Sequence, residues 1–434
     1  MKSISQTLVL LIMLSAQASA ELVELNTEAE FKTVYFSEDQ SASSVTVALF
    51  VIAGEVDVQG PEGLSHYLEH LMFWHADSVN GDALHSRGGN AWVNGIVTSY
   101  YNRSESIDLP DMLEFINRLY SPPVLKKDFM LRERSVVARE YDLRVSENPD
   151  TRAYTAIRRG LYNQHPLSRS VIGTPESISS LTIDQAEDFH QSYYHPQNSV
   201  LFISGNLPSQ TVIKAVNEKL GHLTAGDRYV QEWRGENIAS DFDHTTQVND
   251  GQVDYEQLIY LTLSKKPNFA DPVRNWYTLR LLESIIDSAL PGGIARPLRM
   301  DSFILRTFGL NIIDTLQDYF EFSLFAAPDK GVTLQHSTEK IADTLHSIAE
   351  KGIPQETLER VKKRMLQTAE RNANDFDSNY IRLAEQLSAG VTPVIGNQHL
   401  NHIKAVTLED VNDYLDALAN PERRAIAHIK PTGS

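Results

Sequence analysis

A pattern in the first half of the chain recurs in the second half, and this internal repeat constrains the fold more than any other sequence feature. The stretches 181–196 and 406–421 share a threonine with an acid two residues later, an acid–aromatic pair and a proline, each offset by 225 residues. A threonine followed by acids is typical of a helix N-terminus, because its hydroxyl caps free backbone amides. Each proline leads into a strand-like run, at 199–205 and 424–430. The chain therefore contains the same helix–strand unit twice.

The length of 434 residues fits roughly two or three domains of ordinary size. Both halves also contain an apolar strand-like run and long charged amphipathic stretches that predict helices. We expect an α/β (α+β) fold of two similar tandem domains, each a mostly antiparallel sheet packed with helices. The domains are expected at 21–228 and 248–434, and the polar segment 229–247 is expected to be the linker.

Composition excludes several classes of protein. The chain has no cysteine, which excludes disulfide scaffolds, thiolate zinc fingers, iron–sulfur centres and cysteine hydrolases. With 57 Asp+Glu against 39 Lys+Arg the net charge is −18, which is unsuited to binding phosphate backbones. No segment is apolar over the length that a membrane-spanning helix needs. We therefore expect no nucleic-acid partner and no membrane span.

Residues 1–20 have the pattern of a secretory signal peptide. Lys2 provides a positive start, the run 8–14 is apolar, and Ala18-Ser19-Ala20 offers small residues at a cleavage site. We expect cleavage after Ala20 and export to the periplasm of a bacterium, with full secretion as the alternative. Export also fits the lack of cysteine, because an oxidising compartment penalises stray thiols.

One motif in the first half predicts metal chemistry. Residues 66–70 read His-Tyr-Leu-Glu-His, and on a helix this spacing places His66, Glu69 and His70 on one face. Two imidazoles one turn apart can bind one metal ion, and a carboxylate beside them can take a proton from water. The order His-x-x-Glu-His is the inverted form of the zincin motif. Glu69 is therefore the predicted general base; the alternative is a surface helix with merely polar histidines.

A tetrahedral catalytic zinc needs a third protein ligand and an open position. Glu133 and Glu140 lie seven residues apart in a helical stretch, so they share a face. Glu140 is the candidate ligand, and Glu133 would lie one layer behind it to orient the site. Glu147 lies another seven residues on, and spacing alone does not separate it from Glu140. An acidic stripe on a solvated helix is the alternative for any one of these carboxylates.

These residues lie within a longer resemblance to a known family. The stretch 63–73, Gly-Leu-Ser-His-Tyr-Leu-Glu-His-Leu-Met-Phe, resembles the active-site helix of the pitrilysin-like inverted-zincin (HxxEH) peptidases. That family includes insulin-degrading enzyme and the mitochondrial processing peptidase. Further matches follow in the family's order: Gly88-Gly89-Asn90-Ala91, Thr98, Tyr100, Glu133, Glu140, His165-Pro166, Gly173-Thr174-Pro175, Tyr194, Pro196, Asn198 and Gly205.

The resemblance implies a zinc endopeptidase that cleaves peptides or small unfolded proteins. It implies one Zn²⁺ per chain, bound by His66, His70 and Glu140, with Glu69 as general base and Glu133 as a second catalytic glutamate. It also implies that bound peptide pairs with a strand edge at Gly89, Asn90 and Ala91. The alternative is a non-catalytic binding or assembly subunit on the same scaffold. Such subunits usually lose a ligand or the base, whereas this chain keeps all of them.

The second half lacks a metal motif and departs from the family's substrate-binding pattern, an arginine followed seven residues later by a tyrosine. Arg299 is present, but residue 306 is arginine. Family members of this length pair two chains, so we expect a heterodimer in which a metal-free sister chain supplies the missing pair. The alternative is a homodimer in which Arg299 and Arg306 contact peptide directly.

Three further histidines are candidates for metal binding by residue type alone. His75, His85 and His190 do not lie at helical spacing from His66 or His70. We therefore expect them to be surface or loop residues.

Overall fold

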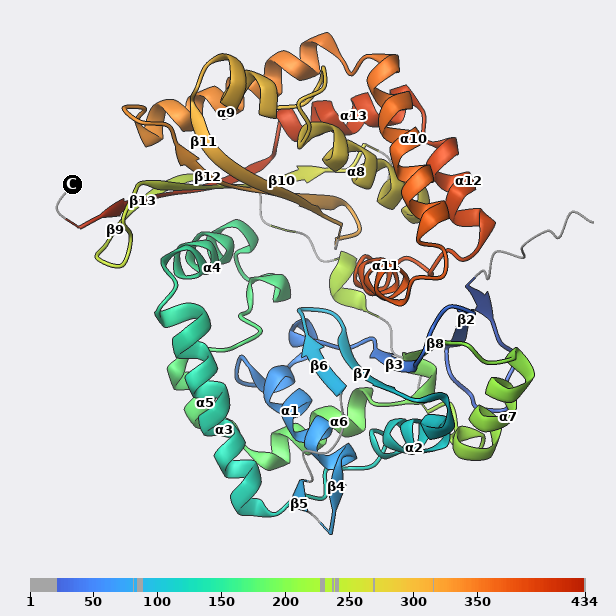
Figure 1. Ribbon diagram of the computed structural model, residues 1–434. Coiled ribbons are helices and arrows are strands. Elements are labelled where there is room, and N and C mark those ends of the chain that lie inside the picture. Colours follow the sequence, from blue (N-terminus) through green and yellow to red (C-terminus); the bar gives the residue numbers. More distant parts are fainter. Residues whose placement is uncertain are drawn as a thin grey trace, which may run out of the picture.

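A computed structural model describes residues 22–432 except 81, 84–88, 227–230, 236–237, 239–241, 268–269 and 315. The expected signal peptide at 1–20 and His85 lie outside the described residues. The described chain forms two domains stacked one above the other, each a sheet with helices on its outer face (Figure 1). The two-domain α/β prediction is confirmed.

The first domain has a six-stranded sheet with the order β1-β2-β8-β3-β7-β6. β2 and β8 are parallel, whereas the other neighbours are antiparallel. Its central strands are apolar and buried along their whole length, because both faces of the sheet are covered. The strands are β1 (Val23–Glu24), β2 (Thr33–Glu38), β3 (Val45–Val51), β6 (Gly89–Val93), β7 (Thr98–Ser104) and β8 (Ser199–Gly205).

The second domain repeats this topology with five strands in the order β9-β13-β10-β12-β11. Its single parallel pair, β9 with β13, corresponds to β2 with β8. The repeated helix–strand unit is α6 (Ile183–Tyr193) with β8 in one domain and α13 (Leu408–Ala419) with β13 in the other. The strands are β9 (Phe242–Asp250), β10 (Gln257–Lys265), β11 (Leu305–Ile313), β12 (Tyr319–Pro328) and β13 (Arg423–Pro431).

Both repeated helices begin at the threonine that the sequence indicated. The Thr182 hydroxyl accepts a hydrogen bond from the Gln185 amide, and the Thr407 hydroxyl accepts one from the Asp410 amide. In each case the third helical residue returns a bond to the threonine amide, which completes a capping box.

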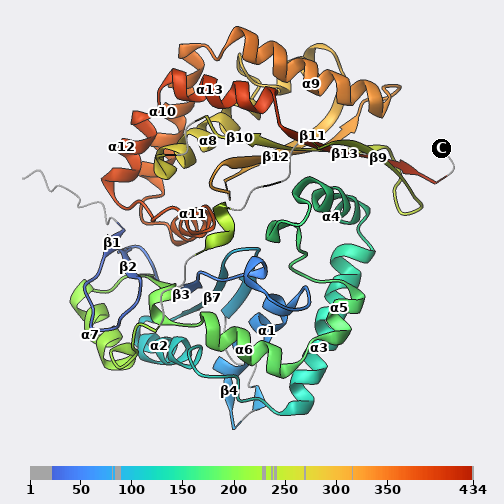
Figure 2. The ribbon, with the colours of Figure 1, turned by 180° about the vertical axis from the view of Figure 1, so that it is seen from behind.

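The helices of the first domain pack mainly on the face of the sheet that points away from the second domain (Figure 2). They are α1 (Leu64–Ala76), α2 (Leu109–Arg118), α3 (Lys127–Tyr141), α4 (Pro149–Tyr162), α5 (Pro175–Ser180), α6 (Ile183–Tyr193) and α7 (Ser209–Leu220). The second domain is covered by α8 (Pro272–Ile286), α9 (Leu334–Lys351), α10 (Gln355–Arg371), α11 (Phe376–Ser388), α12 (Asn397–Ala405) and α13 (Leu408–Ala419).

One helix of each domain packs on the inner face of the other domain's sheet. α4 of the first domain packs on β10 and β13, and α11 of the second domain lies against the first sheet (Figure 1). The ring of Phe376 stacks on Phe202 with centroids 5.3 Å apart, and Tyr380 contacts Phe50. A third hydrophobic core therefore joins the two domains and fixes their orientation.

Two expectations are corrected here. The segment 229–247 is not wholly a linker, because β9 begins at Phe242. This strand is at the sheet edge and most of its side chains are exposed or half-buried, so its composition resembles that of a linker. His75 and His190 are not surface or loop residues: both lie in helices, α1 and α6, and are buried. Within the described residues, no helix has the length and apolar character needed to cross a membrane.

Candidate metal centre

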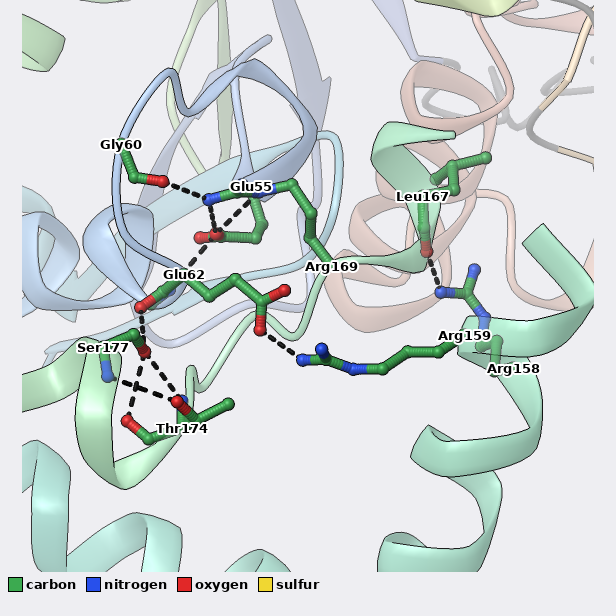
Figure 3. Close-up of polar contacts among 10 residues, drawn as sticks. Glu55, Gly60, Glu62, Arg158, Arg159, Leu167, Arg169, Thr174 and Ser177 are labelled. Carbon is green, nitrogen blue, oxygen red and sulfur yellow. Dashed lines mark hydrogen bonds and ion pairs between the residues drawn. The ribbon is translucent and has the colours of Figure 1, made fainter. Parts of the chain in front are cut away.

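The loop before α1 is fixed by a network of polar contacts (Figure 3). The buried Glu55 carboxylate accepts hydrogen bonds from the Ser65 hydroxyl at 2.6 Å, the Gly63 amide at 3.1 Å and the Arg169 guanidinium at 2.9 Å. Gly63 itself has φ +87°, and a Cβ there would meet the Gly173 backbone at 3.1 Å. This turn therefore favours glycine. Together with the contacts of Glu55, it fixes where α1 begins.

α1 presents the predicted motif residues together. Leu68, Leu71 and Met72 are fully buried against the domain core, which determines how the helix is rotated. His66 and Glu69 are 6% and 7% exposed, and the rings of His66 and His70 lie 4.8 Å apart. His66, Glu69 and His70 each offer a ligand atom, and these atoms lie within 4.8 Å of one another. That is the only such cluster among the residues that the structure describes.

α3 brings both predicted glutamates to this cluster. The Glu140 oxygens lie 3.5 Å from His66 Nε2 and 3.8 Å from His70 Nε2. Glu133 lies one layer behind, with its Oε2 3.1 Å from His70 Nδ1. The two helices pack side by side, and the buried Val137 lies between the two glutamates in sequence. The seven-residue spacing thus places one carboxylate against the ring edges and the other behind them.

The donor atoms fit a metal ion. His70 Nδ1 donates to Glu133, so its Nε2 lone pair points toward the cluster, which is the arrangement common for metal-binding histidines. Glu140 Oε2 is buried and forms no hydrogen bond of acceptable geometry among the described residues, and its close contacts are the Arg144 guanidinium at 3.2 Å and His66 Nε2 at 3.5 Å. Buried carboxylates are normally paired with a cation or bound to a metal ion. Two imidazoles and one carboxylate around a common point match the three-ligand sets of catalytic zinc.

The electrostatic environment favours the same interpretation. Burial, together with the nearby His70 and Arg144, lowers the pKa of His66 to about 3, so this ring is neutral and can act as a ligand. Burial lowers the pKa of His70, but the hydrogen bond to Glu133 and the surrounding carboxylates outweigh it and give a net rise. Burial raises the pKa of Glu69 to about 7. A carboxylate with that pKa exchanges protons readily near neutral pH.

The structure separates Glu140 from Glu147. Glu147 follows a π-helical turn (Asp142–Ser146) and is exposed. Within that turn lies Arg144, whose guanidinium is 3.2 Å from Glu140 Oε2. We did not single out Arg144 from the sequence. Its i, i+4 spacing from Glu140 is the signal that could have identified it.

The residues of the expected peptide-binding edge lie in strand β6. Among the described residues, β6 is the last strand of the first sheet and pairs only with β7. Gly89, Asn90 and Ala91 lie at its start, and α1 packs against it. Asn90 is exposed. An unpaired strand edge can accept an extended peptide as an additional strand, and this one lies beside the helix that carries the candidate metal ligands.

A cleft of about 490 Å³ opens beside His66 and between the domains. Arg144, Arg158 and Tyr154 line it from the first domain, and Ile313 and Ser388 line it from the second. These residues come from distant parts of the chain, so no local pattern indicated them.

The expected substrate-binding residue of the second domain, Arg299, lies on that domain's surface. Arg299 lies in a π-helical turn (Arg296–Asp301) that packs on α9 and β11, and it is exposed. Arg306 on β11 is also exposed, and its guanidinium lies over the Tyr255 ring at 4.5 Å from the centroid.

Two family models match consecutive parts of the chain. Residues 33–175 match the model of insulinase (peptidase family M16), and residues 180–365 match the model of the peptidase M16 inactive domain. The chain belongs to peptidase family M16. The predicted pitrilysin-like relationship is thereby confirmed. The inactive-domain model covers mainly the second domain, and no candidate metal cluster occurs among that domain's described residues.

Curated relatives of this M16 chain carry zinc-protease names. An uncharacterized zinc protease of Mycobacterium tuberculosis is 27% identical over 90% of this chain and 89% of its own length. A zinc protease of Bacillus subtilis is 30% identical, but the match spans 45% of this chain and 44% of that protein. The zinc protease PqqE of Helicobacter pylori is 28% identical over 38% of this chain and 39% of its own length.

Solved structures show the same fold along nearly the whole chain. A protease from Helicobacter pylori superimposes with a TM-score of 0.77 at 20% identity and covers 94% of this chain and 99% of that chain. An M16-like peptidase from Alicyclobacillus acidocaldarius superimposes with a TM-score of 0.76 at 18% identity, over 95% and 98% of the two chains.

Proposed function

We propose that this M16 protein is a zinc-dependent endopeptidase that hydrolyses peptides or small unfolded proteins. The observation that carries the proposal is the convergence of His66, His70 and Glu140, in which the Glu140 oxygens lie 3.5 Å from His66 Nε2 and 3.8 Å from His70 Nε2. A zinc ion held there supplies Lewis acidity to polarise the scissile carbonyl and to activate water.

The protein's own residues carry the proton movements. Glu69 lies beside the ligand atoms, with its Oε2 3.9 Å from His66 Nε2. Its carboxylate takes a proton from the attacking water and delivers it to the nitrogen of the departing amine. Glu133 holds the His70 ring through Nδ1 and keeps the ligand in one orientation. The β6 edge at Gly89, Asn90 and Ala91 aligns the peptide through backbone hydrogen bonds, which place few demands on substrate sequence.

The test separates metal binding from catalysis. Glu69→Gln should keep about one zinc per chain and abolish hydrolysis of a quenched fluorescent peptide, whereas His70→Ala should lose the zinc. Glu147→Gln is the matched control, because this exposed carboxylate lies outside the cluster. Unchanged turnover in Glu69→Gln would remove that residue from the mechanism. Zinc binding without any turnover in the wild-type chain, alone or with a partner, would favour the alternative of a non-catalytic binding subunit.

We further propose that the active form contains two subunits, with a metal-free sister chain as partner. The periplasmic protease PqqL from Escherichia coli has the same fold, and this chain covers 47% of the PqqL chain. One chain of the present length therefore corresponds to half of that structure. Residue 306 is arginine where the family pattern has tyrosine, which leaves Arg299 without its usual companion. Full activity and a monomeric mass for the purified chain would contradict the heterodimer; a homodimer with full activity would favour Arg299 and Arg306 as direct peptide contacts.

The site of action is proposed to be the periplasm. The support is the signal-peptide pattern of residues 1–20. Amino-terminal sequencing of the mature protein from fractionated cells should find Glu21 first, in the periplasmic fraction. A mature chain that begins at Met1 in the cytoplasm would contradict export.

A further inference from the structure

The second domain contains a cavity that plays no part in the proposed chemistry. It has a volume of about 790 Å³ and lies among α10, α11 and α12, with Leu22 of the N-terminal segment at its side. None of its lining residues also lines the cleft beside His66. Its size falls within the range of small-molecule binding sites, roughly 300–1,000 Å³.

The lining of this α10–α12 cavity combines apolar surface with cationic groups. Met365, Leu400 and Ile403 contribute apolar side chains. Arg382 and Arg364 contribute guanidinium groups, and Glu370 on α10 is the one carboxylate among the lining residues. The described residues therefore give the cavity one more cationic group than anionic groups.

Arg382 is a cationic group of the cavity that has no counter-charge among the described residues. Its guanidinium donates to the Val394 carbonyl and, at 2.7 Å, to the Asn379 side chain, and both acceptors are neutral. Among the described residues, no carboxylate forms an ion pair with it. Burial lowers the pKa of Arg382, and the groups that oppose this shift are the hydroxyls of Tyr277 and Tyr35. Arg382 is half-buried, and a partly desolvated cation without a counter-charge is costly.

Arg382 keeps donors for a ligand. An arginine side chain has five N–H groups, and the two bonds named above use two of them, while the residue itself lines the cavity. His399 also lines the cavity. Its Nδ1 lies 2.7 Å from the Tyr277 hydroxyl, so its Nε2 is left for another partner. Burial, with the charge of Arg382 close by, lowers the pKa of His399 to about 3, so the ring contributes hydrogen bonding and no positive charge.

We propose that the α10–α12 cavity binds a small organic carboxylate with an apolar body, whose anionic end pairs with Arg382 and whose apolar part lies on Met365, Leu400 and Ile403. A carboxylate matches the planar fork of a guanidinium and supplies the missing negative charge. Two sources share this chemistry: the C-terminus of a short peptide that ends in an apolar residue, and a fatty-acid-like anion. The inference does not depend on the proposed zinc chemistry.

Isothermal titration calorimetry of the full mature chain tests the proposal with two matched pairs of probes. The peptide pair is N-acetyl-Ala-Ala-Leu as the free acid and as the amide; the other pair is decanoate and decanol. We expect at least one acid to bind about tenfold or more tightly than its neutral counterpart, as a charge-assisted bond requires. The acid that binds identifies the source. EDTA treatment should leave this binding unchanged, which separates it from the metal centre.

Variants locate the binding. Arg382→Gln should weaken it about tenfold or more, and Arg382→Lys should restore part of it. Ala369→Phe, which fills the cavity without changing a charge, should abolish it, so the test survives if Arg382→Gln folds poorly. Arg360→Gln is the control, because this exposed arginine on α10 pairs with Glu356 outside the cavity. The proposal is overturned if neither acid binds at millimolar concentration, if acid and neutral probe bind equally, or if Ala369→Phe leaves binding intact.

Discussion

The contact between Glu133 and His70 gives a quantitative test of the metal centre. Glu133 Oε2 lies 3.1 Å from His70 Nδ1, and the Glu133 side chain is buried. Loss of a hydrogen-bond partner behind a metal-binding histidine typically lowers metal affinity about 10–100-fold, or about 1.4–2.7 kcal/mol. Glu133→Ala removes the acceptor and its charge, so it should show the full loss.

Glu133→Gln removes the charge but keeps an acceptor for His70 Nδ1. Because a charge-assisted hydrogen bond is roughly twice as strong as a neutral one, about half of that free energy should remain. We therefore expect about a 3–10-fold loss of zinc affinity for this variant. Zinc affinity should therefore rise from Glu133→Ala through Glu133→Gln to the wild type. This graded order distinguishes an orienting hydrogen bond from simple packing.

The assay is a competition titration with a chromophoric zinc chelator at neutral pH, with circular dichroism to verify folding. Glu147→Ala is the control, because Glu147 is exposed and lies beyond the turn that carries Arg144. If Glu133→Ala binds zinc as tightly as the wild type, the contact does not orient His70 and the layered arrangement of ligands is wrong. Equal losses for Glu133→Ala and Glu147→Ala would indicate a general charge effect.

Three further outcomes follow from buried groups and backbone geometry. Burial lowers the pKa of His190 from 6.5 to about 4, so below pH 6.5 the unfolded chain binds a proton that the folded chain does not. The free energy of unfolding should therefore fall by up to about 3 kcal/mol as pH drops to 4, and urea titrations of His190→Gln should show a flatter dependence of this free energy on pH. Glu321 on β12 accepts hydrogen bonds from Tyr162 at 2.6 Å and from Arg158 at 3.2 Å across the domain boundary; Glu321→Ala leaves a buried cation and should cost about 3–5 kcal/mol in denaturant unfolding, and a loss below about 1 kcal/mol would contradict this role. Gly63→Ala should destabilise the protein by about 1–2 kcal/mol and weaken zinc binding, because φ is +87° and the added Cβ meets backbone; Gly309→Ala, where a Cβ has open space, should have little effect on the thermal midpoint.

The candidate site was the most predictable part of this molecule. His66, Glu69 and His70 lie within five consecutive residues, so helical periodicity alone brings them to one face. Glu133 and Glu140 follow from the same periodicity on another helix, but their distance from the histidines does not. That distance depends on the packing of α1 against α3, and it separates Glu140 from Glu147. The histidines at 75 and 190 were assigned wrongly, because residue type does not reveal burial.

Local sequence patterns already encode the two capped helix–strand repeats, the apolar central strands and the spacing of the candidate metal ligands. These depend on interactions within a few residues, which a linear pattern records. Three features emerge only in the folded chain: the packing of α4 and α11 on the opposite domain, the strand within the polar segment before residue 248, and the position of Arg382, which has no carboxylate partner among the described residues. Those features arise from contacts between residues tens to hundreds of positions apart, and their free energy depends on burial that no short stretch of sequence encodes.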